Sequence, residues 1–127
     1  MLSPVKILVA LSDFEGQKSL AGALEGERLN VIFAPTLRDA KEVLGKQQVA
    51  VVFCQVELED GNFRDILNSS ERARAPVVVC APAYDKEVCL DAMCQGAFDF
   101  IAFPYAKKEV DWILTCALPT AGPARSV

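Results

Sequence analysis

The feature that most constrains how this chain can fold is a regular alternation between two spacings of apolar residues. Five short runs are almost continuously apolar, which is typical of strands buried on both faces of a parallel sheet. The segments between them repeat apolar residues every three or four positions, the spacing of a helix with one buried face. The expected strands cover residues 5–11, 30–34, 49–56, 76–81 and 98–102.

Polar and small residues mark where the intervening helices begin and end. Thr36, followed three residues later by Asp39, has the pattern of a capping box, and Gly45 is expected to close that helix. Asp85 can cap a helix that stops at Gly96. Because helices alternate with the strands, we expect an α/β fold: a flavodoxin-like (βα)5 doubly wound three-layer sandwich with a parallel sheet of order 2-1-3-4-5.

The remaining segments complete a single domain. An acidic loop is expected at residues 57–62, a short helix at 63–68 and the last helix at 106–118. A length of 127 residues fits one domain over residues 1–118, and the turn-rich composition of residues 119–127 predicts a frayed tail.

Composition limits the class of protein. Hydrophobic residues make up 52% and charged residues 24% of the chain, which excludes disorder. No apolar run reaches the roughly 18 residues that a transmembrane helix needs, and the N-terminal run has the pattern of a strand and not of a signal peptide. We therefore expect a cytoplasmic protein that does not enter a membrane. A net charge of −4 without a basic stripe also argues against nucleic-acid binding by this domain alone.

Histidine and cysteine usage restricts the possible chemistry. The chain has no histidine, which excludes Ser-His-Asp and Cys-His catalysis and most zinc sites. Its five cysteines are odd in number and form no CxxC pair, so a disulfide framework is not expected. Cys54 and Cys80 fall near the ends of neighbouring strands and could lie close together, although no adjacent cation activates either thiol. We expect both to be buried and inert.

Three segments, in order along the chain, resemble the receiver domain of two-component response regulators. Residues 6–16 (KILVALSDFEG) are similar to the first strand of a receiver and the loop after it. Residues 54–63 (CQVELEDGNF) are similar to the segment after the third strand. Residues 92–105 (AMCQGAFDFIAFPY) are similar to the receiver pattern of a helix ending in Ala-Gly-Ala, a strand, and then Lys-Pro-Phe. The resemblance covers residues 5–118.

The resemblance also implies where an active receiver would carry its chemistry. Two acids after the first strand and an Asp after the third hold Mg²⁺, and that Asp accepts the phosphoryl group; a Thr or Ser and a Lys then contact it. The corresponding positions here are Leu11 and Ser12 for the acids, Gln55 (or Cys54 after a one-residue slip) for the Asp, Cys80 for the hydroxyl, and Phe103 before Pro104 for the Lys. All are replaced, so we expect a pseudo-receiver with no phosphorylation, no enzymatic activity and no cofactor.

Other residues near the strand ends have two possible roles. Asp13, Glu57 and Asp60 are weak candidates for a residual cation site, but such acids more often line a solvated rim and cap helices. Phe103 is expected to pack into the space that a phosphoryl group would occupy. The resemblance implies a cis peptide bond between Phe103 and Pro104.

The last helix predicts an interaction surface. Trp112 lies about 200° around the helix from Val110 and therefore faces away from the core, unless the tail folds back over it. Receivers use one face for dimers and partners, so the resemblance implies a surface formed by the helix at 85–96, the strand at 98–102 and the helix at 106–118. We expect Phe100, Tyr105 and Trp112 at its centre. It would bind a protein partner or a second copy of this chain in a homodimer.

Two alternatives use the same fold. A small-molecule or redox sensor would use the apolar pocket that the replaced residues leave behind. A flavodoxin-like cofactor protein is less favoured because the loop SDFEGQ (residues 12–17) has one hydroxyl and two acids, which repel phosphate.

Overall fold

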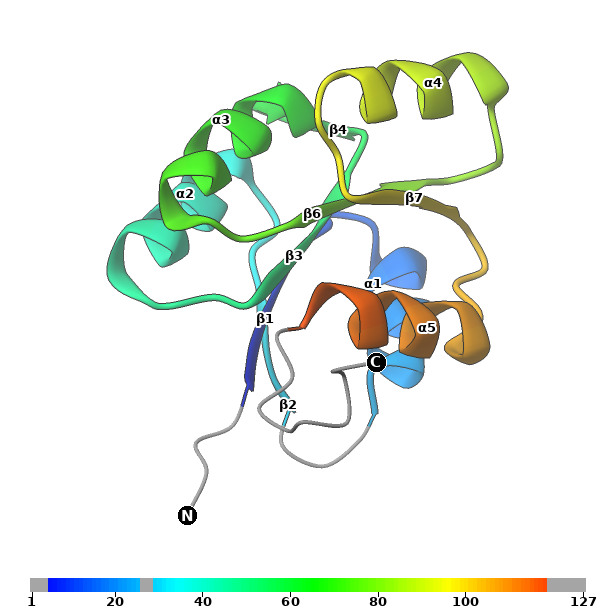
Figure 1. Cartoon of the computed structure of the whole chain (residues 1–127), viewed down its shortest axis with the longest axis horizontal. Helices are drawn as coiled ribbons and strands as arrows, with labels where there is room; N and C mark the ends of the chain where they lie inside the picture. Colours follow the sequence, from blue (N-terminus) through cyan, green and yellow to red (C-terminus); the bar gives the residue numbers. More distant parts are fainter. Residues whose placement is uncertain (1–4, 26–28, 119–127) are drawn as a thin grey trace, which may run out of the picture.

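A parallel five-stranded sheet forms the centre of the molecule in the computed structural model, which describes residues 5–25 and 29–118. The strands are β1 (Val5–Ala10), β2 (Leu29–Phe33), β3 (Val51–Gln55), β6 (Val77–Ala81) and β7 (Asp99–Ala102). Their order is β2-β1-β3-β6-β7 (Figure 1). Because β6 and β7 are the fourth and fifth strands of this sheet along the chain, the order confirms the predicted order 2-1-3-4-5. The predicted tail at residues 119–127 lies outside the described residues.

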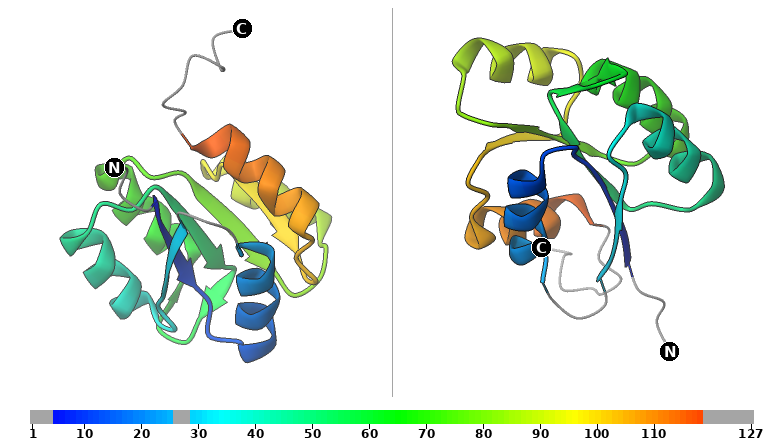
Figure 2. Two further views of the ribbon diagram at one scale, coloured as in Figure 1. Left: turned by 90° about the horizontal axis from the view of Figure 1, so that it is seen from below. Right: turned by 180° about the vertical axis from the view of Figure 1, so that it is seen from behind.

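Helices cover both faces of this sheet, as the three-layer prediction requires (Figures 1 and 2). One face carries α1 (Phe14–Ala23) and α5 (Lys107–Ala117). The other carries α2 (Leu37–Lys46), α3 (Phe63–Ala73) and α4 (Lys86–Cys94). Among the described residues, no helix is long and apolar enough to cross a membrane.

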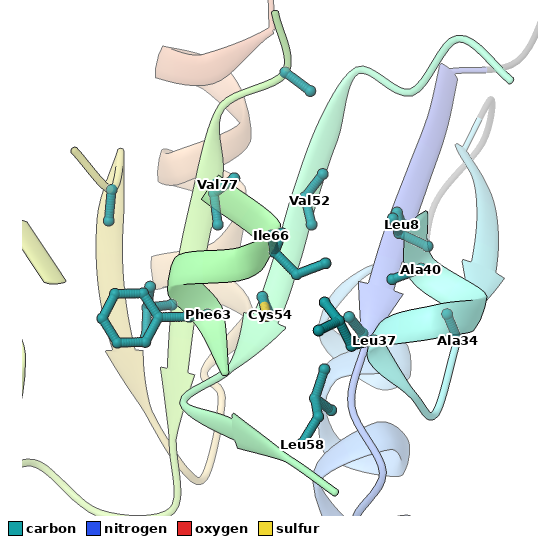
Figure 3. Close-up of a cluster of buried hydrophobic side chains, with 14 of the residues drawn as sticks. Leu8, Ala34, Leu37, Ala40, Val52, Cys54, Leu58, Phe63, Ile66 and Val77 are labelled. Atoms are coloured by element: carbon teal, nitrogen blue, oxygen red, sulfur yellow. The ribbon is translucent and has the colours of Figure 1, made fainter. Parts of the chain in front are cut away.

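Two hydrophobic clusters, one on each face of the sheet, pack the helices against the strands. Successive residues of each central strand face opposite clusters because side chains alternate along a strand. Val52 and Cys54 point to the cluster under α2 and α3, where they lie near Phe63 and Ile66 (Figure 3). Phe53, between them, faces the cluster under α1 and α5. This alternation explains why the central strands are continuously apolar.

The predicted helix starts are confirmed, whereas one predicted end is wrong. The Thr36 hydroxyl accepts a hydrogen bond from the Asp39 amide at the start of α2, and Asp85 caps α4. Gly96 adopts a φ of 107° just after α4, a conformation that favours glycine. Gly45 does not close α2, because the helix continues one residue further before it is capped at Gln47.

The predicted acidic loop after the third strand is a short hairpin. Glu57–Leu58 (β4) pairs antiparallel with Gly61–Asn62 (β5). The following helix α3 runs to Ala73 and is longer than the short helix expected at residues 63–68. The hairpin brings Asp60 to the N-terminus of α2, where its two carboxylate oxygens accept hydrogen bonds from the Leu37 and Arg38 amides at 2.7 and 3.1 Å.

Candidate functional site

A pocket of about 650 Å³ lies at the carboxyl ends of β1, β3, β6 and β7. This is the edge where ligands of doubly wound sheets bind, because the loops that follow the strands converge there. Five of the positions that the resemblance assigns to receiver chemistry lie at or beside this pocket. Four of them line it: Leu11, Gln55, Cys80 and Phe103. The fifth, Ser12, is hydrogen-bonded to Gln55.

Gln55 lies at the end of β3, and both the oxygen and the nitrogen of its side-chain carboxamide are hydrogen-bonded. Its Oε1 accepts a hydrogen bond from the Ser12 amide at 3.1 Å, and its Nε2 donates to the Ser12 hydroxyl at 3.1 Å. The same Nε2 donates to the Glu57 carbonyl at 2.6 Å. The side chain therefore joins the ends of β1 and β3 without any charge. The one-residue slip is not supported, because Cys54 points into the core on the other face of the sheet.

The positions of the first acid and of the hydroxyl are both buried in the core. Leu11 is 1% exposed and packs in the cluster under α1 and α5. Cys80 is fully buried in the same cluster, and burial raises the pKa of its thiol well above the ordinary value. Neither side chain offers an oxygen to a cation, and the Cys80 thiol stays protonated at neutral pH.

Phe103 forms one wall of the pocket and does not fill it. Its ring meets Tyr105 edge-on, with ring centroids 5.8 Å apart, and the side chain is 39% exposed. Tyr105 is held in place because its amide donates to the Ser19 hydroxyl at 3.0 Å. That Phe103 packs into the phosphoryl space stays a prediction; the ring leans on its aromatic neighbour and leaves the rest of the pocket open. The Phe103–Pro104 peptide bond is cis, as predicted.

The three candidate cation ligands do not come together. Asp13 caps α1 by accepting a hydrogen bond from the Gly16 amide at 2.8 Å, and Asp60 caps α2. Hydrogen bonds from the Leu37 and Arg38 amides lower the pKa of Asp60, the Leu37 bond most. Glu57 lies on the hairpin and lines the pocket. Among the described residues, no three His, Cys, Asp or Glu side chains are placed to hold a metal ion.

The proposed cysteine pair is not assembled. Cys80 is paired in register with Gln55, so Cys54 lies one residue away and points to the opposite face of the sheet. Burial raises the pKa of the Cys54 thiol to about 12, with a smaller contribution from the charge of Asp65. Two thiols on opposite faces cannot form a disulfide without breaking the sheet. The two residues are neighbours on adjacent strands, as expected, but their side chains point to opposite faces of the sheet.

Only part of the predicted interaction surface is exposed. Trp112 is 67% exposed on α5, as its helical position predicts. Phe100 and Tyr105 are 8% and 6% exposed, so their place in an exposed aromatic centre is wrong. Phe100 points into the core beneath α4, and Tyr105 packs under α5. The exposed apolar side chains on the α4 side of this surface are instead Leu90, Met93 and Phe98.

The structure adds pocket residues that our sequence analysis missed. Tyr84 lies in the loop between β6 and α4, lines the pocket and contacts the Phe100 ring edge-on, with centroids 6.1 Å apart. Asp85, expected from the sequence only to cap α4, also lines it, as does Glu15, one of the two acids of the loop SDFEGQ. The rule that ligands sit beyond the carboxyl ends of parallel strands could have identified Tyr84, because residues 82–85 directly follow β6.

The sheet order and the crossover helices define the receiver-type fold. A response regulator from Thermotoga maritima superposes with a TM-score of 0.76 at 24% identity, covering 90% of this chain and 99% of that one. The beryllofluoride-activated NtrC4 receiver domain dimer superposes with a TM-score of 0.79 at 22% identity, covering 89% of this chain and 95% of that chain. The chain therefore has the fold of response regulator receiver domains.

Curated sequences show a weaker similarity in the same direction. The chain is 27% identical over 116 residues to the sensory transduction protein LytR of Streptococcus agalactiae serotype V, covering 87% of this chain and 47% of that protein. It spans less than half the length of the curated relatives it matches. No protein-family model matches the chain.

Proposed function

We propose that this chain is a receiver domain of the two-component response-regulator family that is not phosphorylated and acts in the cytoplasm through contacts with a protein partner. The observation that carries the proposal is the state of Gln55. Its amide stands at the end of β3 and is already paired with Ser12 and Glu57. A carboxamide at this position cannot form an acyl phosphate.

The surrounding residues support the same conclusion. Phosphoryl transfer to a receiver needs a metal ion and a cation to neutralise the charge that develops on the phosphoryl oxygens. Leu11 is apolar and buried, and Phe103 presents a ring where a lysine would stand. The described residues that line the pocket include no Lys or Arg.

The test is the intact mass of the protein after incubation with acetyl phosphate and Mg²⁺. We expect no mass increase, and none for Gln55→Asp, because that variant still lacks the acids at Leu11 and Ser12. A receiver with its full acidic set serves as the positive control. A hydroxylamine-labile gain of one phosphoryl group on the unmodified chain would refute the proposal.

The partner surface of this proposal lies on the two helices that flank the edge strand β7. Trp112 on α5, together with Leu90 and Met93 on α4, exposes apolar area that costs free energy in water. Lys108 and Glu109 lie one helical turn before Trp112 and bring charges of both signs beside it, which can pair across a two-fold axis. A homodimer through this α4-β7-α5 surface is the form we propose first.

Of the two alternatives, the pocket favours the small-molecule sensor. A redox role is not favoured, because Cys54 and Cys80 point to opposite faces and burial raises the pKa of both thiols. A phosphate-bearing flavin is not favoured, because Asp13, Glu15 and Glu57 line the pocket where the phosphate would bind.

A further inference from the structure

The pocket at the carboxyl edge of the sheet is large enough for an organic ligand. Its volume of about 650 Å³ lies within the roughly 300–1,000 Å³ that small-molecule sites span. The apolar residues of its lining that keep exposed surface are Val56, Pro82, Ala83 and Val88. An apolar ligand body would therefore displace water from apolar surface when it binds.

Three aromatic rings stand in this lining. They are Tyr84, Phe103 and Tyr105, from the loops that follow β6 and β7. Tyr84 is 67% exposed and Phe103 is 39% exposed, so both rings have surface that the protein leaves uncovered. Aromatic faces carry negative electrostatic potential and attract organic cations, quaternary ammonium groups above all.

The charges of the lining have one sign. Asp13, Glu15, Glu57 and Asp85 line the pocket, and the described lining residues include no Lys or Arg. Asp13 and Asp85 are engaged in capping α1 and α4. Glu15 and Glu57 are exposed, and their carboxylates make no ion pair among the described residues. These two carboxylates are therefore the ones free to pair with a ligand, and all four repel anions.

We propose that this pocket binds a small organic cation, an ammonium or quaternary ammonium group on an apolar or aromatic body. The aromatic rings and the Glu15 and Glu57 carboxylates would contact the cationic group, while the apolar lining would cover the body of the ligand. A bare metal ion fits less well, because the described residues hold no group of three ligating side chains. The proposal does not depend on the phosphorylation state of the protein, so either proposal can fail alone.

The experiment is an NMR titration of the ¹⁵N-labelled chain with benzyltrimethylammonium, and in parallel with benzenesulfonate, an aromatic probe of opposite charge. We expect the cation to shift the amide signals of Leu11, Gln55, Ala81 and Phe103 saturably, and benzenesulfonate to leave them unchanged. Equal binding of the two probes, no saturable shift with the cation, or shifts confined to other parts of the chain would overturn the proposal.

Two variants test which groups recognise the cation. Glu15→Gln/Glu57→Gln keeps the shape of both exposed side chains and should weaken binding about fivefold or more, as expected for the loss of two exposed charge contacts. Tyr84→Leu keeps apolar bulk but removes one ring, and should weaken binding by a similar factor. Glu42→Gln on α2 removes one exposed charge away from the pocket and should leave the affinity unchanged. Unchanged affinity in both pocket variants, or an equal loss in Glu42→Gln, would refute the assignment.

Discussion

At the residue scale, the thiols of Cys54 and Cys80 are buried and have raised pKa values. Each packs in a different hydrophobic cluster, and burial is the largest cause of the raised pKa of both. Both are therefore protonated in the folded protein at pH values where the same thiols in the unfolded chain ionise. This difference links their burial to the stability of the fold at alkaline pH.

We predict that the free energy of unfolding falls as pH rises above about 9. The folded state then binds more protons than the unfolded state, so each buried thiol removes up to about 1.4 kcal/mol of stability per pH unit. At pH values below the pKa of the thiols in the unfolded chain, the two thiols contribute their full stabilising effect to the free energy of unfolding. Urea unfolding at pH 7.5 and pH 10 measures the loss.

The matched variants are Cys54→Ala/Cys80→Ala, which removes both buried thiols, and Cys116→Ala, which removes an exposed one. The double variant should lose less stability between the two pH values than the parent chain. Cys116→Ala should lose as much as the parent. Equal losses in all three proteins would show that the buried thiols do not control the alkaline response.

Asp60 gives the opposite pH dependence. Hydrogen bonds from the Leu37 and Arg38 amides lower its pKa from the ordinary value of 3.8, so its stabilising effect is present above that value and is lost as pH falls through the folded pKa. Asp60→Asn should lower the thermal midpoint at pH 7, and the difference from the parent should shrink in acid. Glu59→Gln, one residue away and exposed, is the control. A difference that persists unchanged at pH 2 would contradict this account.

At the element scale, the hairpin formed by β4 and β5 connects the site edge of the sheet to α2. It carries Asp60 to the first turn of α2, and Gly61 packs against the Leu37 side chain. A Cβ at Gly61 would overlap the Leu37 side chain and would lie 2.8 Å from the Asp65 carboxylate. By contrast, a Cβ at Gly45 in α2 meets nothing within 4 Å.

Alanine should therefore have opposite effects at these two glycines. Gly45→Ala should stabilise the fold by roughly 0.5–1 kcal/mol, because alanine loses less backbone entropy in a helix. Gly61→Ala should destabilise it by about 1–3 kcal/mol through overpacking against buried Leu37. Chemical unfolding of both variants measures the difference. A stabilising Gly61→Ala would mean that the hairpin can move away from α2 at little cost.

The elements also show how far the sequence predicts this structure. Residues 51–54 and 77–81 are apolar without interruption, so their burial on both faces could be predicted from the sequence pattern alone. The two-residue strands β4 and β5 are too short to carry any periodic signal. In the structure, the segment expected to be a loop is a hairpin whose Asp60 and Gly61 contact α2. Contacts between segments so far apart in the sequence cannot be predicted from local sequence patterns.

The positions of the site residues along the strands were predicted, whereas the contacts between their side chains were not. The resemblance to receivers placed Leu11, Gln55, Cys80 and Phe103 at one edge of the sheet, where the structure has them. The pairing of Gln55 with Ser12 depends on side-chain rotamers across two strands, which the pattern does not specify. The open pocket beside Phe103 depends on the edge-on contact of that ring with Tyr105.

At the scale of the whole molecule, exposed apolar side chains lie on the two helices beside the edge strand β7. Trp112 is the largest of them, and it is 67% exposed. A side chain so exposed contributes little to the packing of a single copy. Its contribution would come from an interface.

We predict that Trp112→Ala dissociates the proposed homodimer and leaves the thermal unfolding of the fold nearly unchanged. Truncation of a central tryptophan typically costs about 2 kcal/mol or more, which is roughly a thirtyfold loss in affinity. Light scattering over a concentration series measures the association. Phe14→Ala, which removes a similarly exposed ring (69%) at the start of α1, is the control and should leave the dimer intact. A strictly monomeric parent chain at high concentration would exclude the dimer.

The neutral bridge between Gln55 and Ser12 also bears on how long a signal would last. An aspartyl phosphate hydrolyses at its own rate, so a phosphorylated receiver carries an internal clock that ends each response. A carboxamide held by hydrogen bonds has no such clock. Under the proposed function, the response of this domain would begin when its partner associates and would last as long as the complex does, so the dissociation rate of the partner would set its duration.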